Sequence, residues 1–467
     1  MSRTSSQGPS LSGKGLYIAI AAWLLLVIVG GLCTWYGWLG PGSGRESEPE
    51  PKAEATVGAT AAPDGSDGEP TDEAPTTIAE VAATSTPASG LDGDDESGNG
   101  DPPTAAPASD QESFGYGVAA NVIGGGDPAY WIGQVDSLGL GWVKQQVKWR
   151  DFEDTPGDVD WTGFDAVVDE ASRRGLKVTF SVVDAPEWSR SYTDQNPQGA
   201  PPDNLELVAD FMGRLVDRYK GRIHAIEVWN EQNLDREWDT AEGVNAERYV
   251  EMLRLSYQAI KSRDPNIIVI SGALSPTGVT ATDPDKPDRI TAMDDFDYMD
   301  QMIALDALSY CDCVGAHHNG INMPPDVAWD EGYNDPTAQF RGPFDDPHHS
   351  WSFKSTLWGY HDRIAAAGSS KPLCVTEFGW ASAEGFEGYP PGFEFALDNT
   401  LEEQAEWDVE AFQLMREWGF VRLAFLWNLN YSQLGWGPRD PNAPYALLDF
   451  NGAPRPAFHA IQEMPKP

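Results

Sequence analysis

Segment 141–184 reads GWVKQQVKWRDFEDTPGDVDWTGFDAVVDEASRRGLKVTFSVVD, and it holds the pattern that decides the fold. Two valine-rich runs are typical of buried strands, Trp142–Trp149 and Leu176–Asp184. Between them, the apolar residues of Asp165–Arg174 recur at the spacing of an amphipathic helix. A strand, a helix and a second strand in this order predict a parallel βαβ unit.

Strand and helix signals alternate in this way eight times from Phe114 onward. Eight βα units within about 350 residues predict an α/β fold of the (β/α)8 TIM barrel type. The expected strands are Gly115–Val122, Trp142–Trp149, Leu176–Asp184, Ile223–Trp229, Ile267–Ala273, Cys313–His318, Leu373–Phe378 and Val421–Leu429. The expected helices include Asp165–Arg174, Leu205–Tyr219, Ala246–Lys261, Phe296–Leu308 and Glu402–Trp418.

A doubly wound open sheet is the alternative arrangement of the same units. Such a sheet usually offers a glycine-rich phosphate turn after its first strand. Gly124-Gly125-Gly126 follows the first expected strand but lacks the GxGxxG spacing, so the barrel is favoured.

An uncharged run, Leu16–Leu39, precedes the barrel and is long enough to cross ~30 Å of hydrocarbon as a helix. Trp35 and Trp38 near its end are typical of an interfacial aromatic belt. Arg3 and Lys14 precede the run and the chain beyond it is acidic. The positive-inside bias therefore predicts a single-pass protein of the cell membrane, with residues 1–15 in the cytoplasm, residues 16–39 in the lipid bilayer and the barrel outside. A cleaved signal peptide and a lipid attached to Cys33 are the alternatives.

Residues 40–112 are rich in Pro, Ala, Ser, Thr, Gly and acidic residues, with only Arg45 and Lys52 as basic residues. Such a segment cannot bury a core, and we expect a disordered linker between the anchor and a catalytic barrel at residues 113–467. The formal net charge of the whole chain is −42. This charge excludes a general nucleic-acid binder and disfavours a strongly anionic substrate, unless a local basic cleft overrides it.

The four cysteines are too few for a disulfide framework. Cys311 and Cys313 lie at the start of one expected strand and Cys374 lies inside another. Neighbours on the same face of one strand rarely bridge each other, because the geometry is strained. We therefore expect free buried thiols.

The histidine pairs His317-His318 and His348-His349 raise the question of a metal. Adjacent side chains on a strand face opposite ways, so each pair is expected to offer at most one ligand to a site. No cofactor and no catalytic metal is expected. A structural calcium held by acidic loops such as Asp294-Asp295 stays open.

The active site of such a barrel lies where strands end at its C-terminal face. The fourth expected strand runs into Asn230-Glu231, and the seventh runs through Glu377 towards Trp380. Each places a carboxylate at the rim, and glycoside hydrolysis needs two carboxyl groups flanking one glycosidic oxygen. The pair Glu231 and Glu377 is therefore the candidate catalytic pair.

These residues resemble clan A of the glycoside hydrolases, a superfamily of retaining enzymes with catalytic glutamates on strands four and seven. Segment 141–161 is similar to the second βα unit of families 39 and 42, and the chain is most like family 39. Pro186-x-Trp188 after strand three and Trp427 on strand eight also fit. The resemblance covers the whole barrel region.

The resemblance implies that Glu231 is the general acid/base and Glu377 the nucleophile. It implies that Asn230 bonds the sugar 2-hydroxyl, that His317 lies at the rim, and that Trp427 forms the floor under the sugar. Many clan members carry a tyrosine two residues after the strand-six histidine, where this chain has Asn319. The hydrogen-bond partner of the nucleophile is therefore open, with Tyr333 and Tyr431 as candidates from neighbouring loops.

Four further residues are candidates for contact with substrate: Trp188, Trp380, Lys148 and Asn319. The tryptophans are flat surfaces on which a sugar can stack, although plain packing explains them equally well. Glu227 has the same strand parity as Glu231, so we expect it to point into the barrel and to pair with Lys144 or Lys148.

The function predicted from these residues is a retaining glycoside hydrolase that cleaves β-linked polysaccharide or oligosaccharide outside the cell. A transglycosylase on the same site is one alternative. A non-catalytic carbohydrate-binding barrel is another, although both glutamates are present. A metal-dependent hydrolase would need His-x-His on the first strand, which reads Gly115-Tyr116-Gly117-Val118 instead.

Overall fold

Eight parallel strands form one sheet in the order β5-β4-β3-β2-β1-β10-β9-β8 of the computed structural model, which describes residues 114–192, 199–435 and 437–466. The two edge strands meet through parallel bridges from Ile270 to Cys313 and from Leu274 to Ala316, which close the sheet into a barrel. The predicted (β/α)8 barrel is thereby confirmed. The strands are β1 Gly115–Ala119, β2 Trp142–Lys148, β3 Lys177–Val183, β4 Ala225–Val228, β5 Ile268–Ser271, β8 Val314–Gly320, β9 Leu373–Trp380 and β10 Val421–Leu426.

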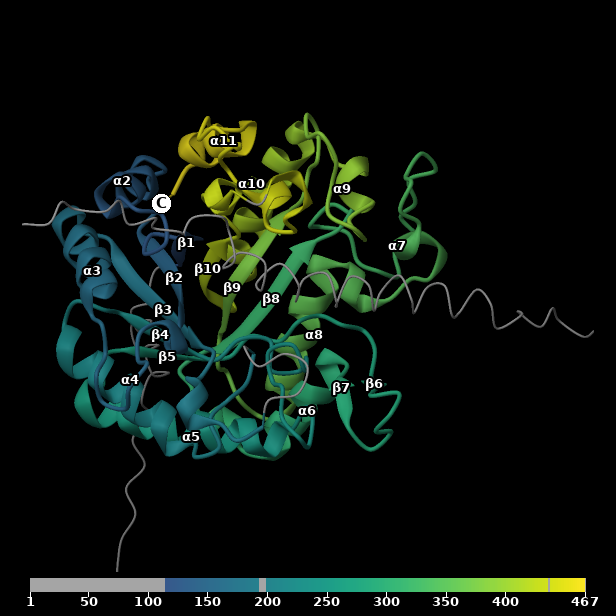
Figure 1. Cartoon of the computed structure of the whole chain (residues 1–467). Coiled ribbons are helices and arrows are strands. Elements are labelled where there is room, and N and C mark those ends of the chain that lie inside the picture. The colour runs from purple at the N-terminus through teal and green to yellow at the C-terminus, as the bar shows by residue number, and fades with distance from the viewer. Residues whose placement is uncertain (1–113, 193–198, 436, 467) are drawn as a thin grey trace, which may run out of the picture. The chain divides into compact units, whose positions relative to one another are not determined.

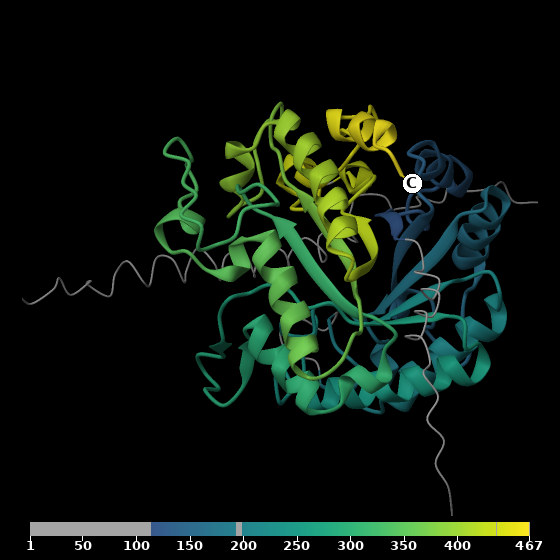
Figure 2. The ribbon, with the colours of Figure 1, turned by 180° about the vertical axis from the view of Figure 1, so that it is seen from behind.

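Helices surround the strands on the outside (Figures 1 and 2). The longer helices turn an apolar stripe inward, as in α4, where Phe211, Leu215 and Tyr219 are buried. The five predicted helices are present to within a few residues. The helices are α2 Pro128–Ser137, α3 Thr162–Arg174, α4 Glu206–Tyr219, α5 Ala246–Arg263, α6 Asp295–Ala304, α7 Gly342–Asp345, α8 Phe353–Ala366, α9 Phe395–Asp398, α10 Leu401–Trp418 and α11 Pro456–Glu463.

An antiparallel hairpin that the sequence pattern did not predict lies between β5 and α6 (Figure 1). It consists of β6 Ala281–Thr282 and β7 Ile290–Ala292. Arg289, next to β7, pairs with Asp235 at 3.1 Å and with Asp239 at 2.7 Å. The hairpin therefore braces the loop that follows β4.

Strand β9 carries one residue more than either neighbouring strand at the level of Thr376 and Glu377. Ala316 and His317 of β8 pair with Val375 and Glu377, so Thr376 has no counterpart there. The register with β10 shifts at the same place. A bulge of this kind re-aims side chains, and both Thr376 and Glu377 make contacts in the barrel interior.

A disulfide joins Cys313 and Cys374 in the barrel interior, towards the end where the strands begin, with a Cα–Cα distance of 5.7 Å. The expectation of free thiols is wrong for these two cysteines. Cys313 directly precedes β8 and Cys374 lies in β9, and the pairing of Gly315 with Cys374 brings the two side chains together. Cys311 is free and buried, as expected.

The predicted anchor Leu16–Leu39 and linker 40–112 lie outside the described residues. Within the residues that are described, no helix is both long and apolar enough to cross a bilayer.

Candidate active site

Glu231 and Glu377 both lie at the C-terminal rim of the barrel and are 7% and 6% exposed. Glu231 follows the end of β4 on a left-handed backbone, with φ of 43°, and Trp229 two residues earlier has φ of 75°. Non-glycine residues rarely adopt such angles, and they cluster at functional sites. The Glu231 amide is held by the Ala273 carbonyl at 2.8 Å, which fixes the turn against the end of β5.

His317 of β8 lies between the two carboxylates. Its Nδ1 is 3.2 Å from Oε1 of Glu231, and its Nε2 is 3.8 Å from Oε1 of Glu377. Burial opposes a charge on the imidazole, but Glu377 and Glu231 outweigh it and raise the pKa of His317. A protonated His317 donates from Nδ1 to Glu231 and from Nε2 to the Thr376 hydroxyl at 3.0 Å, and its positive charge faces both glutamates.

Lys144 of β2 ties Glu377 to the barrel interior. Its Nζ is 3.2 Å from Glu377 and 3.2 Å from Glu227, and it also donates to the Thr376 carbonyl at 3.1 Å. Burial disfavours its charge, but the two carboxylates raise the pKa of Lys144 above its usual range. The predicted interior pair of Glu227 is confirmed with Lys144. The further contact with Glu377 was missed, because strand parity alone does not say which strands face each other.

Arg236 pairs directly with Oε2 of Glu231. Burial favours the neutral acid, yet Arg236 and His317 together hold the pKa of Glu231 at about 2. Arg236 was not predicted as a site residue, because its position in the loop after β4 carries no periodic signal. The free protein therefore keeps Glu231 ionised.

Two cavities are lined by residues of the loops at this end of the barrel, and Glu231 lines the first of them. The first, here called the aromatic cavity, has about 180 Å³, and its wall includes Glu231, Arg236 and Asn319 together with the rings of Phe340, Trp351, Phe393, Phe395 and Tyr445. The second, here called the polar cavity, has about 720 Å³ and is lined by Asn121, Gln145, Gln146, Lys148, Asn430 and Tyr431 among others. A third cavity lies at the opposite end of the barrel and contains none of the candidate residues. The openings beside Glu231 and Lys148 offer room for sugar units.

Several of the predicted substrate-binding residues lie at these cavities. Lys148 lines the polar cavity and is 3.9 Å from Asp184. Asn319 lines the aromatic cavity. The side-chain oxygens of Asn319 and of Asn230, the residue before Glu231, are buried without a hydrogen-bond partner among the described residues. Buried amides of this kind are ready to bond a ligand hydroxyl.

Trp427 packs in an aromatic cluster with Phe393, Phe395 and Tyr445 of the aromatic cavity, and its ring is 4.6 Å from that of Tyr431. Trp427 is 7% exposed. Glu377 contributes to raising the pKa of Tyr431, after burial, whereas the raised pKa of exposed Tyr333 has no contribution from Glu377. Of the two tyrosines, Tyr431 is therefore the one near Glu377. Lys144 donates a hydrogen bond to Glu377 at 3.2 Å.

The structure does not bring Trp380 and Trp188 to the carboxylates. Trp380 is 1% exposed, donates to the Met323 carbonyl at 2.8 Å and packs on Phe353 of α8, which favours plain packing over sugar stacking. Trp188 donates to the Glu153 carbonyl at 2.7 Å and meets Trp149 edge-on, and it lines neither cavity. Both rings pack in the hydrophobic core outside the barrel interior.

One cluster of described residues has the composition of a metal site, and it is formed by Asp294, His348 and His349. The expectation that a histidine pair offers only one ligand is wrong here, because residues 348 and 349 do not form a strand. His348 is extended and His349 begins a 3-10 turn, His349–Trp351.

Solved structures share this fold. The barrel superposes on a family 39 glycoside hydrolase from the gut symbiont Bacteroides cellulosilyticus WH2 with a TM-score of 0.52 at 17% identity, covering 75% of this chain and 63% of that one. A family 39 enzyme from Xanthomonas axonopodis pv. citri gives 0.51 at 16% identity, with 76% and 66% covered. A monomeric β-xylosidase from Caulobacter crescentus CB15 gives 0.51 at 20% identity, with 76% and 68% covered.

The chain thus spans a little under two thirds of the length of the first two family 39 enzymes. The resemblance to family 39 is confirmed at the level of the fold. Neither a protein-family model nor a curated protein sequence matches the chain.

Proposed function

We propose that the protein is a retaining glycoside hydrolase that cleaves β-linked polysaccharide or oligosaccharide, with Glu377 as nucleophile and Glu231 as acid/base. The observation that carries this proposal is the placement of both carboxylates against one buried histidine, His317. Two carboxyl groups facing one small space are what double displacement at an anomeric carbon requires. The fold shared with family 39 enzymes supports the assignment.

The environment of Glu377 suits a nucleophile. Lys144 and His317 present positive charge to the carboxylate that would attack the anomeric carbon. When the glycosyl bond forms, that negative charge is lost and Lys144 keeps Glu227 as its partner. The lysine is therefore never left unpaired in the interior.

The environment of Glu231 requires a change on substrate binding. A general acid must carry a proton, whereas Arg236 keeps Glu231 ionised in the free protein. Arg236 also lines the aromatic cavity, so a sugar entering there displaces the guanidinium or takes up its hydrogen bonds. Loss of that ion pair in a site closed to water raises the pKa of Glu231 and lets it protonate the leaving oxygen.

Glu237 is the alternative acid, because burial raises its pKa. Its carboxylate is 3.9 Å from Arg236. We assign the role to Glu231 because only Glu231 shares His317 with Glu377. The variant Glu237→Gln is accordingly expected to keep most of its turnover of natural substrate.

The test is azide rescue of two variants with an activated aryl glycoside. Glu377→Gly is expected to give an inverted glycosyl azide, because the small anion enters the space of the lost nucleophile. Glu231→Ala is expected to give a retained glycosyl azide through the glycosyl-enzyme. Glu387→Gln, which removes an exposed carboxylate, is the matched control and should remain fully active. Opposite anomers would exchange the two roles, and near-normal activity in either variant would exclude that residue.

The place of action that we propose is outside the cell, with the barrel tethered by Leu16–Leu39. The uncharged run supports an anchor, and the Cys313–Cys374 disulfide is typical of an oxidising compartment. The intact mass of the mature protein tests the tether. A mature N-terminus beyond Leu39 contradicts it.

A further inference from the structure

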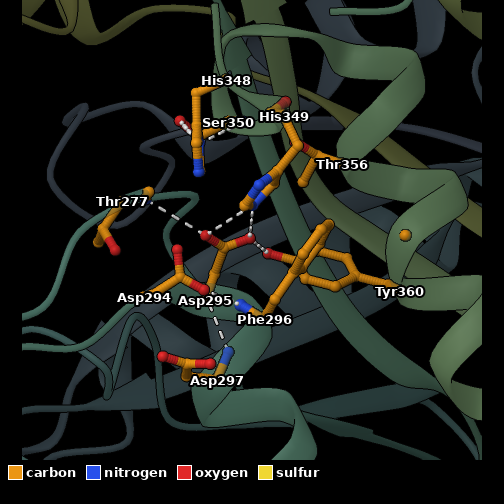
Figure 3. A network of polar contacts seen from close by, with 12 residues as sticks. Thr277, Asp294, Asp295, Phe296, Asp297, His348, His349, Ser350, Thr356 and Tyr360 are labelled. Atoms are coloured by element: carbon orange, nitrogen blue, oxygen red, sulfur yellow. Dashed lines mark hydrogen bonds and ion pairs between the residues drawn. The ribbon is translucent and has the colours of Figure 1, made fainter. Parts of the chain in front are cut away.

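We propose that Asp294, His348 and His349 bind one divalent transition-metal ion, with Zn²⁺ as the ion that this donor set fits best. One potential ligand atom from each residue lies within 4.8 Å of the other two (Figure 3). The site is separate from the two candidate catalytic glutamates. It joins the N-terminus of α6, where Asp294 is the cap, to the segment in front of α8.

The two histidines converge because the chain changes conformation between them. His348 is extended, with φ of −148° and ψ of 154°, and His349 starts the 3-10 turn. Their ring centroids are 4.1 Å apart, and the ring planes are tilted by 46°. Figure 3 shows both side chains on the side of the segment that faces Asp294 and Asp295.

A buried carboxylate orients His349 from behind. Nε2 of His349 is 3.3 Å from both carboxylate oxygens of Asp295. Asp295 is fully buried and also accepts a hydrogen bond from the Tyr360 hydroxyl at 2.8 Å. Phe296 stacks on the imidazole with centroids 3.6 Å apart. Metal-binding histidines usually donate their second N–H to such a carboxylate. The arrangement fixes the ring and leaves Nδ1 for an ion.

The other two residues already make hydrogen bonds of their own. Nδ1 of His348 accepts the backbone N–H of Ser350 at 3.3 Å and lies 3.0 Å from the Ser350 hydroxyl. An ion that binds His348 therefore replaces this N–H at Nδ1, or binds Nε2 after the ring turns Nδ1 away from the amide. Oδ1 of Asp294 caps α6 by accepting the amides of Phe296 and Asp297. Its Oδ2 has no hydrogen-bond partner among the described residues. All three residues are partly exposed, so an ion can reach them from solvent.

The donor set identifies the class of ion. Two imidazole nitrogens and one carboxylate oxygen suit Zn²⁺ and other borderline divalent ions, whereas Ca²⁺ takes oxygen ligands. Zn²⁺ binds nitrogen at ~2.0–2.1 Å, so the three side chains close around the ion by rotation. Three protein ligands leave one position for water.

The ion would hold one wall of the aromatic cavity. Ser350 and Trp351 follow the two histidines and line that cavity together with Ser275 and Pro276 of the loop after β5. The two loops already touch, since a Cβ on Gly278 would lie 2.7 Å from Nδ1 of His348. A metal that links them therefore acts as a clamp on the substrate cavity, away from the bond-breaking groups.

Zinc binding to the full-length protein, stripped with a chelator and dialysed, tests the proposal without an activity assay. Isothermal titration should give one Zn²⁺ per chain, and thermal unfolding should show a rise in Tm with Zn²⁺ but none with Ca²⁺. Asp295→Asn, which leaves the three ligands in place, should weaken zinc binding by about 10–100-fold. His348→Ala should lose the zinc-dependent rise in Tm, compared with its own metal-free form.

His459→Ala is the matched control, because His459 is an exposed histidine on α11. It should bind zinc like the unchanged protein. The proposal is overturned if His348→Ala and His349→Ala both keep the full zinc response, or if the unchanged protein binds no zinc at micromolar concentration. Neither result bears on the catalytic roles of Glu231 and Glu377.

Discussion

At the scale of single residues, charge pairing decides the chemistry of the site. Glu231 and Glu377 are both buried glutamates at strand ends, yet their partners differ. Arg236 lines the aromatic cavity and holds Glu231, whereas Lys144 is sealed in the barrel interior and holds Glu377. In the proposed mechanism a substrate can displace the first cation but not the second, and this difference separates the proposed acid, Glu231, from the proposed nucleophile, Glu377.

Arg236→Gln should raise the pKa of Glu231, because the neighbouring cation is removed while the carboxylate stays buried. The limb of the pH profile of kcat/KM that reports Glu231 is expected to shift to higher pH. Arg254→Gln, which removes a partly exposed arginine paired with Glu251 on α5, is the control and should leave the profile unchanged. An unshifted profile in Arg236→Gln would show that the pair does not set this pKa.

The same pair makes stability depend on pH. The pKa of Glu231 falls from 4.5 to about 2 on folding, so its contribution is present above pH 4.5 and is lost as the pH falls towards 2. The shift corresponds to roughly 3 kcal/mol in the free energy of unfolding. Denaturant unfolding between pH 5 and pH 2 measures it. Arg236→Gln should flatten this decline, and an equal slope in both proteins would contradict the assignment.

Thr376→Val should destabilise the protein at the same centre. Thr376 donates to Glu227 at 2.6 Å and lies 3.0 Å from Nε2 of His317. Valine keeps the shape of the side chain but removes the hydroxyl, so Glu227 and His317 each lose a hydrogen-bond partner. The expected loss in the free energy of unfolding is about 1–3 kcal/mol. Urea unfolding measures the loss. Thr376→Ser, which restores the hydroxyl, should recover most of it, and recovery by serine separates the hydrogen bonds from packing.

At the scale of elements, a bulge in one strand and a hairpin within one loop position the side chains of the site. The bulge in β9 lets Thr376 and Glu377 both face inward, where a regular strand would turn one of them out. The β6–β7 hairpin braces the loop that carries Arg236, because Arg289 next to β7 pairs with Asp235 and Asp239 of that loop. Neither feature alters the eight-fold pattern, and both are needed to aim side chains.

Arg289→Met should loosen that loop. Asp239 is 4% exposed and accepts from Arg289 at 2.7 Å, so the change leaves a buried carboxylate without this cation. Breaking a buried pair in this way costs about 3–5 kcal/mol. Hydrogen exchange should accelerate more in residues 232–244 than in α10. Helix α10 is the reference because it follows β9, which is far from β4 in the order of the sheet. Uniform acceleration over the barrel would show that the hairpin does not act locally.

At the scale of the whole molecule, the main feature is the closure of the sheet into a barrel. Hydrogen bonds close it between β5 and β8, and the Cys313–Cys374 disulfide links β8 to β9 next to that seam. The disulfide spans 61 residues of sequence. A loop of this length in the unfolded chain gives the crosslink a stabilising effect of roughly 4 kcal/mol.

The double variant Cys313→Ala, Cys374→Ala is therefore expected to lose about 4 kcal/mol in the free energy of unfolding. Cys311→Ala, which removes the free buried thiol, is the control and should lose much less. Guanidinium unfolding with and without reductant measures both. Equal stability of the double variant and the unchanged protein would mean that the crosslink is absent from the mature protein.

The sequence by itself determined the eight strands, five helices and the two rim glutamates, because the period of apolar residues and the place where a strand ends are local properties. It also placed Glu227 in the interior by strand parity. The tertiary structure alone decided which remote groups meet. The disulfide, the Lys144 contact with Glu377 and the Arg236 pair each join residues whose approach depends on strand register, on barrel closure or on the path of a loop. The burial of Trp380 was decided in the same way, because a ring at a strand end can face the cleft or the helices, and only the packing of α8 against β9 selects one side.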